Sequence, residues 1–374
     1  MLFRWLVFTG IVFVVCGVLN SAIAFPERVA VTLFEAHPPV ASILAQGPLV
    51  VLQPGPQRMP SGQYEICARQ AGVELVTGQK HLCVRARRLV LQGAAGKVAL
   101  TYPGLRSRRY RGIVSISSEN SGMLRIVNEL DCRDYVTSVA GSETLPGWPL
   151  EALKCQAILT QTRLARYKLG DELGDSTQRE VYLGVDSERP AVRSAVDSVW
   201  GQLLTYDRRP VEAFYHSACA GGTSDAAEFF GAKAGSFPYL PGVACDFCKP
   251  SPFYKEKVVR IPGTTFERLK AGAEPEILSR DRRGRPLTVG TGSRRVVTGY
   301  KFWLLLGEKL GWDKVPGTRF SIIRLPDRAV EIRSTGAGHG VGLCQWGAAE
   351  QALRGRSCEE ILKYYFAGAK IQQR

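Results

Sequence analysis

Acidic residues are scarce in this sequence of 374 residues, which has 34 Asp and Glu against 49 Lys and Arg and a formal charge of +15. Internal repeats and low-complexity tracts are absent, and 45% hydrophobic residues supply enough apolar surface for a core. These features exclude a disordered or collagen-like chain. The basic excess predicts an anionic partner: nucleic acid, a membrane surface or a carboxylate-bearing polymer of a cell wall.

Long apolar runs are lacking beyond the N-terminus. Arg4 precedes an apolar run at 5–19, and Ser21-Ala22-Ile23-Ala24 has the small–x–small pattern of a signal-peptidase site. Because a spanning helix needs about 20 apolar residues, residues 1–24 are predicted to be a cleaved secretory signal, with an uncleaved membrane anchor as the alternative. The chain is therefore expected in the periplasm or cell envelope, touching a membrane only through this segment, which argues against nucleic acid as its partner.

Cysteine is plentiful, with 10 residues, of which Cys16 lies in the predicted signal. The rest are odd in number, so complete disulfide pairing within one chain fails. The pairs His216-x2-Cys219 and Cys245-x2-Cys248 offer the ligands of a closed tetrahedral zinc site, which is structural because no position stays open for water. Alternatively, Cys245 and Cys248 form disulfides and His216 donates a hydrogen bond. The other cysteines pair or stay buried: Cys67, Cys83, Cys132, Cys155, Cys344 and Cys358.

The pattern of apolar residues predicts an α+β fold. Short apolar runs separated by Pro-Gly and Ser-Gly turns indicate a β-rich N-terminal region, assigned to 25–120, ahead of a mixed α+β region at 121–374 that carries the zinc site. The clearest helix follows Trp148-Pro149 and extends to Gly170. Further helices are expected at 192–200 and 345–353 and strands at 203–206 and 320–325, while 255–300 has no clear pattern.

Glu143 is the first candidate catalytic residue. It lies in the segment 141–149, rich in small and ring residues, which is predicted to be a loop before the clearest helix. A carboxyl among apolar neighbours keeps its proton more readily, as a general acid near neutrality requires. The residues alone favour a plainer role, in which Glu143 caps the helix or pairs with an arginine.

A second candidate segment, Gly336–Ala348, surrounds His339 with small residues. Glycines at this density indicate backbone in close approach to a ligand or another strand. His339, Gln345 and Trp346 would supply a proton-active group, an amide and an aromatic platform suited to sugars. The alternative is a tight glycine turn whose histidine satisfies buried carbonyls.

Together these motifs resemble the stage II sporulation protein D (SpoIID) family, which includes the amidase enhancer LytB. The matching segments run in family order over about 109–372. They are Arg109–Gly112, Val127–Leu130, Asp134–Val136, Ser142-Glu143, Trp148–Ala157, Tyr215–Thr223, Pro238–Leu240, Gly336–Ala348 and Ile361–Tyr365. The resemblance implies a SpoIID-type catalytic domain in the mixed region.

The resemblance further implies a peptidoglycan lytic transglycosylase. Such an enzyme cuts the β-1,4 bond between N-acetylmuramic acid and N-acetylglucosamine, preferably in glycan strands stripped of stem peptides, and forms a 1,6-anhydro ring. The family's catalytic glutamate corresponds to Glu143, and its glycan-contacting arginine to Arg163. Substrate contacts are also expected at Tyr215, Ser217, His339, Gln345 and Trp346. Some family members carry zinc, in agreement with the ligand set read from the spacing.

Two other functions compete with this prediction. A non-catalytic glycan-binding protein could recruit or stimulate a cell-wall amidase, as the LytB resemblance allows; an acid at Glu143 favours the enzyme, since a binding module has no need of it. A zinc-binding structural domain would explain the cysteines and leave the segment around His339 without a purpose.

Overall fold

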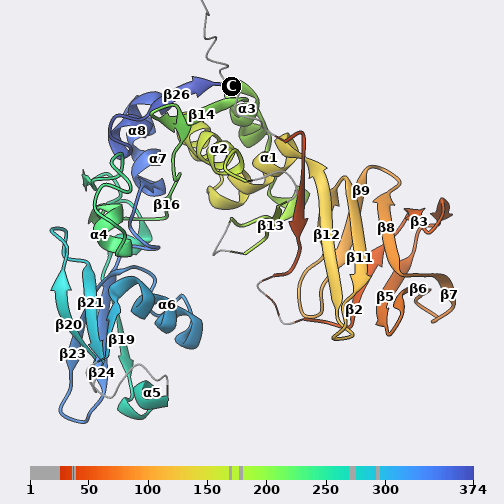
Figure 1. Cartoon of the computed structure of the whole chain (residues 1–374), viewed down its shortest axis with the longest axis horizontal. Helices are drawn as coiled ribbons and strands as arrows, with labels where there is room; N and C mark the ends of the chain where they lie inside the picture. The colour runs from red at the N-terminus through yellow and green to blue at the C-terminus, as the bar shows by residue number, and fades with distance from the viewer. Residues whose placement is uncertain are drawn as a thin grey trace, which may run out of the picture.

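Figure 1 shows the computed structural model of the chain, which describes residues 26–35, 37, 39–167, 171–176, 180–268, 275–291 and 295–374. The predicted signal or anchor at 1–24 lies outside these residues. Within the described ranges, no helix combines the length and apolar character needed to cross a membrane.

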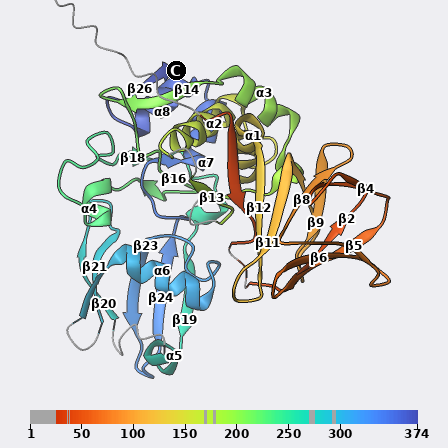
Figure 2. The ribbon, with the colours of Figure 1, turned by 45° about the vertical axis from the view of Figure 1, so that its right-hand side comes forward.

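Two antiparallel sheets form the N-terminal region, seen at the right of Figures 1 and 2. One has the order β13-β1-β12-β11-β8-β3-β4, in which only the β1–β13 pair is parallel, and the other has the order β10-β9-β2-β5-β6-β7. Buried and exposed residues alternate along β1 and β9, so one face of each strand packs into the core. The predicted boundary at 120 falls in the turn between β11 and β12, two paired strands of one sheet.

The strands of the first sheet are β1 (Arg28–Thr32), β3 (Leu49–Gln53), β4 (Gln57–Met59), β8 (Arg88–Gly93), β11 (Ile113–Ser118), β12 (Leu124–Asp131) and β13 (Glu172–Gly174). Those of the second are β2 (Ser42–Gln46), β5 (Gln63–Arg69), β6 (Gly72–Thr77), β7 (Leu82–Ala86), β9 (Lys97–Thr101) and β10 (Arg108–Arg111).

A layer of helices follows, with α2 (Leu150–Leu164) at its centre. Nearly every side chain of α2 from Ala152 onward is buried, because α1, α3, α7 and α8 all pack against it. This explains why its sequence lacks a polar face. The helix ends at Leu164, before the predicted end at Gly170.

The neighbours of α2 are α1 (Cys132–Glu143), α3 (Pro190–Ser198), α7 (Gln345–Leu353) and α8 (Cys358–Tyr365), and the 3-10 turn η1 (Gly184–Ser187) packs against α1. A small sheet at the C-terminus joins β14 (Gln202–Tyr206), β15 (Arg209–Pro210) and β26 (Lys370–Gln373). The predicted helices at 192–200 and 345–353 and the predicted strand at 203–206 are therefore present within one or two residues.

A third part, at the lower left of Figure 1, contains two three-stranded sheets and α6 (Gly299–Leu310). Phe302, Trp303 and Leu306 of α6 build its separate apolar core. The remaining elements are α5 (Gly263–Arg268), β19 (Lys257–Ile261), β20 (Pro275–Arg280), β21 (Pro286–Thr291), β22 (Arg295–Thr298), β23 (Arg319–Arg324) and β24 (Val330–Thr335). The predicted strand at 320–325 corresponds to β23, and the segment 255–300, without a clear pattern, supplies half of this part. The observed fold confirms the α+β class with a β-rich N-terminal region.

Short pairings connect this third part to the helices. β16 (Tyr215–His216) runs parallel to β25 (Leu343–Cys344), and β17 (Gly221–Gly222) pairs with β18 (Ala244–Cys245). In the sequence, α4 (Ala226–Phe230) lies between β17 and β18, and the 3-10 turn η2 (Pro252–Tyr254) follows β18. These pairings bring both predicted site segments, around 215 and around 340, to one place.

Candidate active site and cysteine cluster

Glu143 is the last residue of α1, not a loop residue as predicted. The Asp131 side chain caps the start of this helix, accepting from Arg133 N–H at 2.7 Å. The helix stops because Thr144 adopts extended backbone angles. Glu143 thus projects from the end of a packed helix, which fixes its position more firmly than a loop would.

The Glu143 carboxyl opens into a cavity of about 1260 Å³ between the helical layer and the third part of the fold. Six of the seven predicted catalytic and substrate-binding residues line it together: Glu143, Arg163, Tyr215, Ser217, His339 and Gln345. The opposite wall is aromatic and charged, with Phe253, Lys255, Lys257, Trp303, Glu308 and Trp312. Trp346, the seventh, is not among the lining residues and packs edge-on against Trp148 at 5.7 Å between ring centroids.

Burial raises the pKa of the Glu143 carboxyl above its ordinary value. One oxygen, Oε1, accepts a hydrogen bond from the Val181 backbone N–H at 3.0 Å. This bond opposes the rise, as do three other neighbours: Tyr215, Arg163 and Gln345. Desolvation dominates, so the acid form is favoured more than in water, as a general acid requires.

Glu180 is a second carboxyl near Glu143, and sequence reasoning missed it. Its side chain is only 4% exposed and lies 3.3 Å from Arg163, measured from guanidinium Nε to Oε1. Two tyrosines, Tyr135 and Tyr215, donate hydrogen bonds to it, at 3.1 and 3.4 Å. The segment around Glu180 matched no motif, so nothing in the sequence marked this residue.

His339 lies in the predicted close approach of glycine-rich backbone. Gly338 has φ +87°, and a Cβ there would lie 2.9 Å from His216 Cβ. At Gly342 a Cβ would meet the Phe214 carbonyl oxygen at 2.1 Å. Only glycine fits at either position, so these residues let the segment pack against β16. The backbone thus approaches another strand, one of the two alternatives that the sequence left open.

The His339 ring is neutral over most of the pH range. Burial lowers its pKa to about 4. Its Nδ1 accepts a hydrogen bond from the Val341 N–H at 3.1 Å, which makes Nδ1 the unprotonated nitrogen. The ring lies beside His216, with centroids 5.5 Å apart. Above pH 4 it therefore offers the cavity a neutral imidazole instead of a charge.

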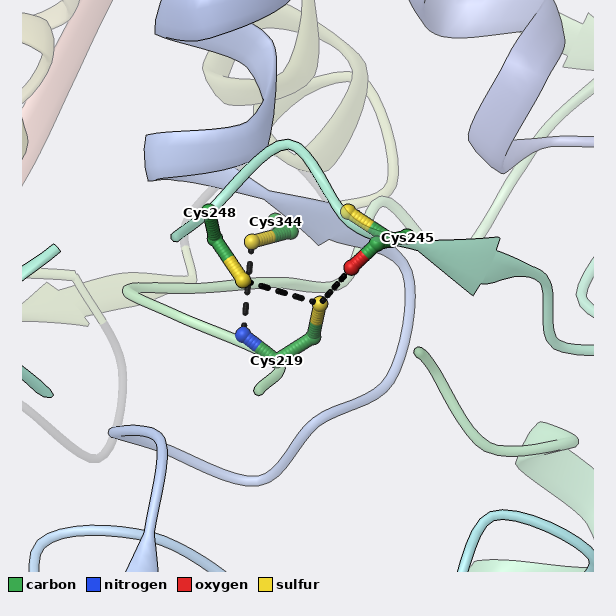
Figure 3. Close-up of side chains that lie close together, drawn as sticks. All are labelled: Cys219, Cys245, Cys248 and Cys344. Carbon is green, nitrogen blue, oxygen red and sulfur yellow. Dashed lines mark hydrogen bonds between the residues drawn. The ribbon is translucent and has the colours of Figure 1, made fainter. Parts of the chain in front are cut away.

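Four buried cysteines converge at one point, as Figure 3 shows: Cys219, Cys245, Cys248 and Cys344. All four sulfur atoms lie within 4.8 Å of one another, and those of Cys219 and Cys248 are 3.4 Å apart. A zinc ion with Zn–S bonds of about 2.3 Å holds four sulfurs about 3.8 Å apart, so these residues fit a tetrahedral site. Hydrogen bonds, above all from the Cys219 thiol, lower the pKa of Cys248.

Cys344 takes the place predicted for His216 in this cluster. The His216 ring Nδ1 lies 3.0 Å from the Val341 carbonyl oxygen, and the residue is not among the four. The cause is the pairing of β16 with β25, which sets His216 and Cys344 side by side and points the thiol of Cys344 at the cluster. His216 instead lines the cavity.

The other five cysteines in the described residues are free as well. Cys67, Cys132, Cys155 and Cys358 are buried, and Cys83 is partly exposed. The Cys155 thiol donates a weak hydrogen bond to the sulfur of Cys358 at 3.4 Å. Of the six cysteines outside the predicted zinc set, four are therefore buried as free thiols, Cys83 is partly exposed, and Cys344 joins the cluster.

Comparison with known proteins gives the family. Residues 120–206 match the stage II sporulation protein (SpoIID) family. An uncharacterized protein of Brachyspira hyodysenteriae is 31% identical over 278 residues, 70% of this chain and 72% of that protein. Stage II sporulation protein D of Bacillus subtilis is 26% identical over 279 residues, 66% of this chain and 76% of that protein. An amidase enhancer of B. subtilis is 24% identical over 284 residues, 62% of this chain and 39% of that protein.

The fold and the cavity define an α+β protein with a partly buried acid at the end of a helix. This chain belongs to the SpoIID family, which confirms the resemblance read from its motifs.

Proposed function

We propose that this protein is a lytic transglycosylase that cleaves the β-1,4 bond between N-acetylmuramic acid and N-acetylglucosamine in peptidoglycan. Family membership supports a function at the cell wall, outside the cytoplasm. The observation that carries the specific proposal is Glu143: a carboxyl of raised pKa, held by the Val181 N–H and opening into a cavity large enough for several sugar rings.

In this mechanism Glu143 acts twice. As an acid it gives its proton to the glycosidic oxygen, and the bond to the anomeric carbon of the muramic acid breaks. As a carboxylate it then takes the proton from the 6-hydroxyl of the same sugar, whose oxygen closes the 1,6-anhydro ring. The proton count of the enzyme is unchanged after one turnover. Because the nucleophile belongs to the substrate, no second carboxyl of the protein has to take part.

The other cavity residues are assigned to binding. Aromatic side chains on the far wall, Phe253 and Trp312, offer flat apolar faces to sugar rings. Lys255 and Lys257 are exposed at the same wall. A glycan strand without stem peptides carries a free lactyl carboxylate on each muramic acid, and the lysines supply the opposite charge. This supports peptide-stripped strands as the preferred substrate.

The cysteine cluster is proposed to bind one zinc ion through Cys219, Cys245, Cys248 and Cys344. Four thiolates leave no ligand position for water, so the ion would stabilise the fold and take no part in catalysis. It would tie the segments 219–248 and β25 together beneath the cavity.

One relative favours a second function. The B. subtilis amidase enhancer shares 24% identity with this chain, which supports a non-catalytic role in which the cavity binds glycan and a cell-wall amidase is the partner. The two functions differ in their products, because only the enzyme changes the glycan.

The test is incubation of purified protein with peptide-stripped glycan strands, followed by mass spectrometry. We expect products with 1,6-anhydromuramic ends. Glu143→Gln should reduce their rate of formation by about 10²–10⁴-fold and leave glycan binding nearly intact. Glu119→Gln is the matched control, because this exposed carboxyl lies in the turn between β11 and β12 and does not line the cavity.

Three results would contradict the proposal. Equal rates for the wild type and Glu143→Gln would remove Glu143 from the mechanism. Reducing ends without the anhydro ring would indicate hydrolysis by water. Binding without any product would favour the amidase-enhancer function.

A further inference from the structure

Glu180 lies directly behind the cavity wall, in contact with the residues that surround Glu143. It is buried and does not line the cavity itself. Its Oε1 faces Arg163 of α2 at 3.3 Å and the Tyr215 hydroxyl of β16 at 3.4 Å, and its Oε2 accepts from the Tyr135 hydroxyl of α1 at 3.1 Å. One carboxyl thus connects three separate elements of the fold.

Two of these three partners reach the cavity. Arg163 and Tyr215 line it, and the Arg163 guanidinium lies over the Tyr215 ring at 5.9 Å from its centroid. Val181, which follows Glu180 in the chain, donates the hydrogen bond to Glu143. The pair Glu180-Val181 therefore contacts both the proposed acid and the side chains beside it.

The charges around Glu180 do not balance if both carboxyls ionise. Among the described residues, Arg163 is the cation that faces Glu180 and Glu143, and two carboxylates would share its charge in a poorly solvated site. Burial raises the pKa of Glu180 to about 7; Arg163 opposes the rise and Glu143 adds to it. Repulsion between two carboxylates is mutual, so a charge on Glu180 also favours the protonated form of Glu143.

We propose that Glu180 is a positioning residue for the reaction proposed above: it holds Arg163 and Tyr215 in place against Glu143, and it forms with Glu143 a carboxyl pair in which a charge on either group favours the acid form of the other. The proposal rests on Glu143 being the general acid. Glu180 exchanges no proton with the substrate, because Glu143 both donates a proton to the leaving oxygen and takes up the proton released by the 6-hydroxyl.

The other groups facing this pair keep their charge state near neutrality. Burial, reinforced by nearby carboxylates, raises the pKa of Tyr135 and Tyr215 well above 10. Burial alone would lower the pKa of Arg163, but Glu180 and the tyrosines that face it, Tyr215, Tyr167 and Tyr135, raise it. His339, which also faces Arg163, is neutral above about pH 4. Among these groups, the charge that changes near neutrality is therefore that of the carboxyl pair.

The experiment compares the wild type with Glu180→Gln, which removes the charge and keeps the size and a hydrogen-bond acceptor. Turnover of stripped glycan needs a protonated Glu143, so activity falls as the pH rises through the pKa of Glu143. The falling part of the pH–rate profile, its high-pH limb, should move down by about one pH unit in Glu180→Gln. At a given pH on that limb, the rate should be about tenfold lower than in the wild type. Glu180→Asp, which restores a charge, should recover much of the shift. The control, Glu119→Gln, changes an exposed carboxyl outside the cavity and should leave the limb in place.

A second measurement separates this proposal from the proposed function. Carbon-13 labelling of the glutamate carboxyls allows the midpoint of Glu143 to be followed by NMR, with Glu143→Gln assigning its signal. We expect a lower midpoint in Glu180→Gln than in the wild type, whether or not the protein turns glycan over. If the wild type were inactive on glycan but the shift were observed, the proposed transglycosylase function would be wrong. The interaction between the two carboxyls would still stand.

Tyr135→Phe provides the same test if Glu180→Gln does not fold. It removes a hydrogen bond that favours ionised Glu180, so Glu180 is neutral more often and the Glu143 midpoint should fall in the same direction by a smaller amount. The proposal would be overturned if folded Glu180→Gln, or folded Tyr135→Phe in its place, kept the Glu143 midpoint and the high-pH limb of the wild type.

Discussion

The Gln345 side-chain amide donates a hydrogen bond to the backbone carbonyl of Glu143 at 3.0 Å, across 202 residues of sequence. The same amide donates to Gln156 Oε1 at 3.1 Å. Gln345 is the first residue of α7, Glu143 the last of α1, and Gln156 lies within α2. One buried amide thus fixes three helices relative to the proposed acid, a role different from the substrate contact predicted for it, although Gln345 also lines the cavity.

The first prediction concerns Gln345→Ala. The change leaves the Gln156 oxygen and the Glu143 carbonyl without their donor, so the free energy of unfolding should fall by about 1–3 kcal/mol. Turnover should fall by about tenfold or more, because a small displacement of Glu143 spoils its alignment. Gln351→Ala is the matched control: Gln351 is a buried glutamine of the same helix that bonds to Tyr365. It should lose stability without a comparable loss of turnover, and equal losses of turnover would contradict this role.

The second prediction separates two tryptophans. Trp312 lines the cavity and is 39% exposed, whereas Trp346 packs against Trp148. Trp312→Ala should weaken binding of stripped glycan by about two- to tenfold, the range that one aromatic contact supplies. Trp346→Phe keeps an aromatic ring in the packed pair, so binding should change less than twofold. Isothermal titration with glycan oligomers measures both, and the reverse order would restore Trp346 as the sugar platform.

The third prediction decides which residue completes the metal site. Purified protein should contain one zinc ion per chain by elemental analysis, and chelation should lower its thermal unfolding midpoint, because binding energy available only to the folded state is lost. Cys344→Ser should lose most of the zinc, whereas His216→Gln should retain it. Retention by Cys344→Ser with loss in His216→Gln would reinstate the imidazole ligand. Protein without zinc, with a disulfide at Cys245 or Cys248, would contradict the site altogether.

The limits of prediction from sequence follow from the distances along the chain. The three thiols Cys219, Cys245 and Cys248 were singled out by their spacing, whereas Glu143 and Arg163 were assigned through motifs shared with the family. Cys344 and Glu180 acquire their roles only through contacts with distant segments. Pairing of β16 with β25 brings Cys344 to its partners, and the packing of α1 on α2 buries Glu180 beside Arg163.

The helix end at Glu143 was missed for a related reason. The residues 141–149 have the small and ring side chains of a loop, but 141–143 continue α1. Residues 135–141 of this helix are all buried, so tertiary packing outweighs the local residue propensities. The β-rich region followed its apolar pattern, and α3 and α7 were predicted within two residues, whereas the end of α2 was not.

The last prediction concerns pH and the buried histidines. In the unfolded chain a histidine binds its proton near pH 6.5, whereas burial lowers the pKa of His339 to about 4 in the folded protein. Between these values the unfolded state binds more protons, so the free energy of unfolding falls as the pH falls below 6.5. From pH 6.5 to pH 5 one such group removes up to about 2 kcal/mol.

Urea unfolding of the wild type and His339→Gln at pH 7 and pH 5 measures this contribution. The decrease in stability between the two pH values should be smaller in His339→Gln, because the group that gains a proton on unfolding is gone. Protons bound by cysteines or carboxyls change the free energy of unfolding of both proteins equally, so their effect cancels in the comparison. His81→Gln is the control, since His81 lies exposed on the surface and its removal should leave the decrease unchanged. Equal decreases in His339→Gln and the wild type would mean that His339 titrates in the folded protein as it does in the unfolded chain, and that the cavity is wet enough to hold it charged.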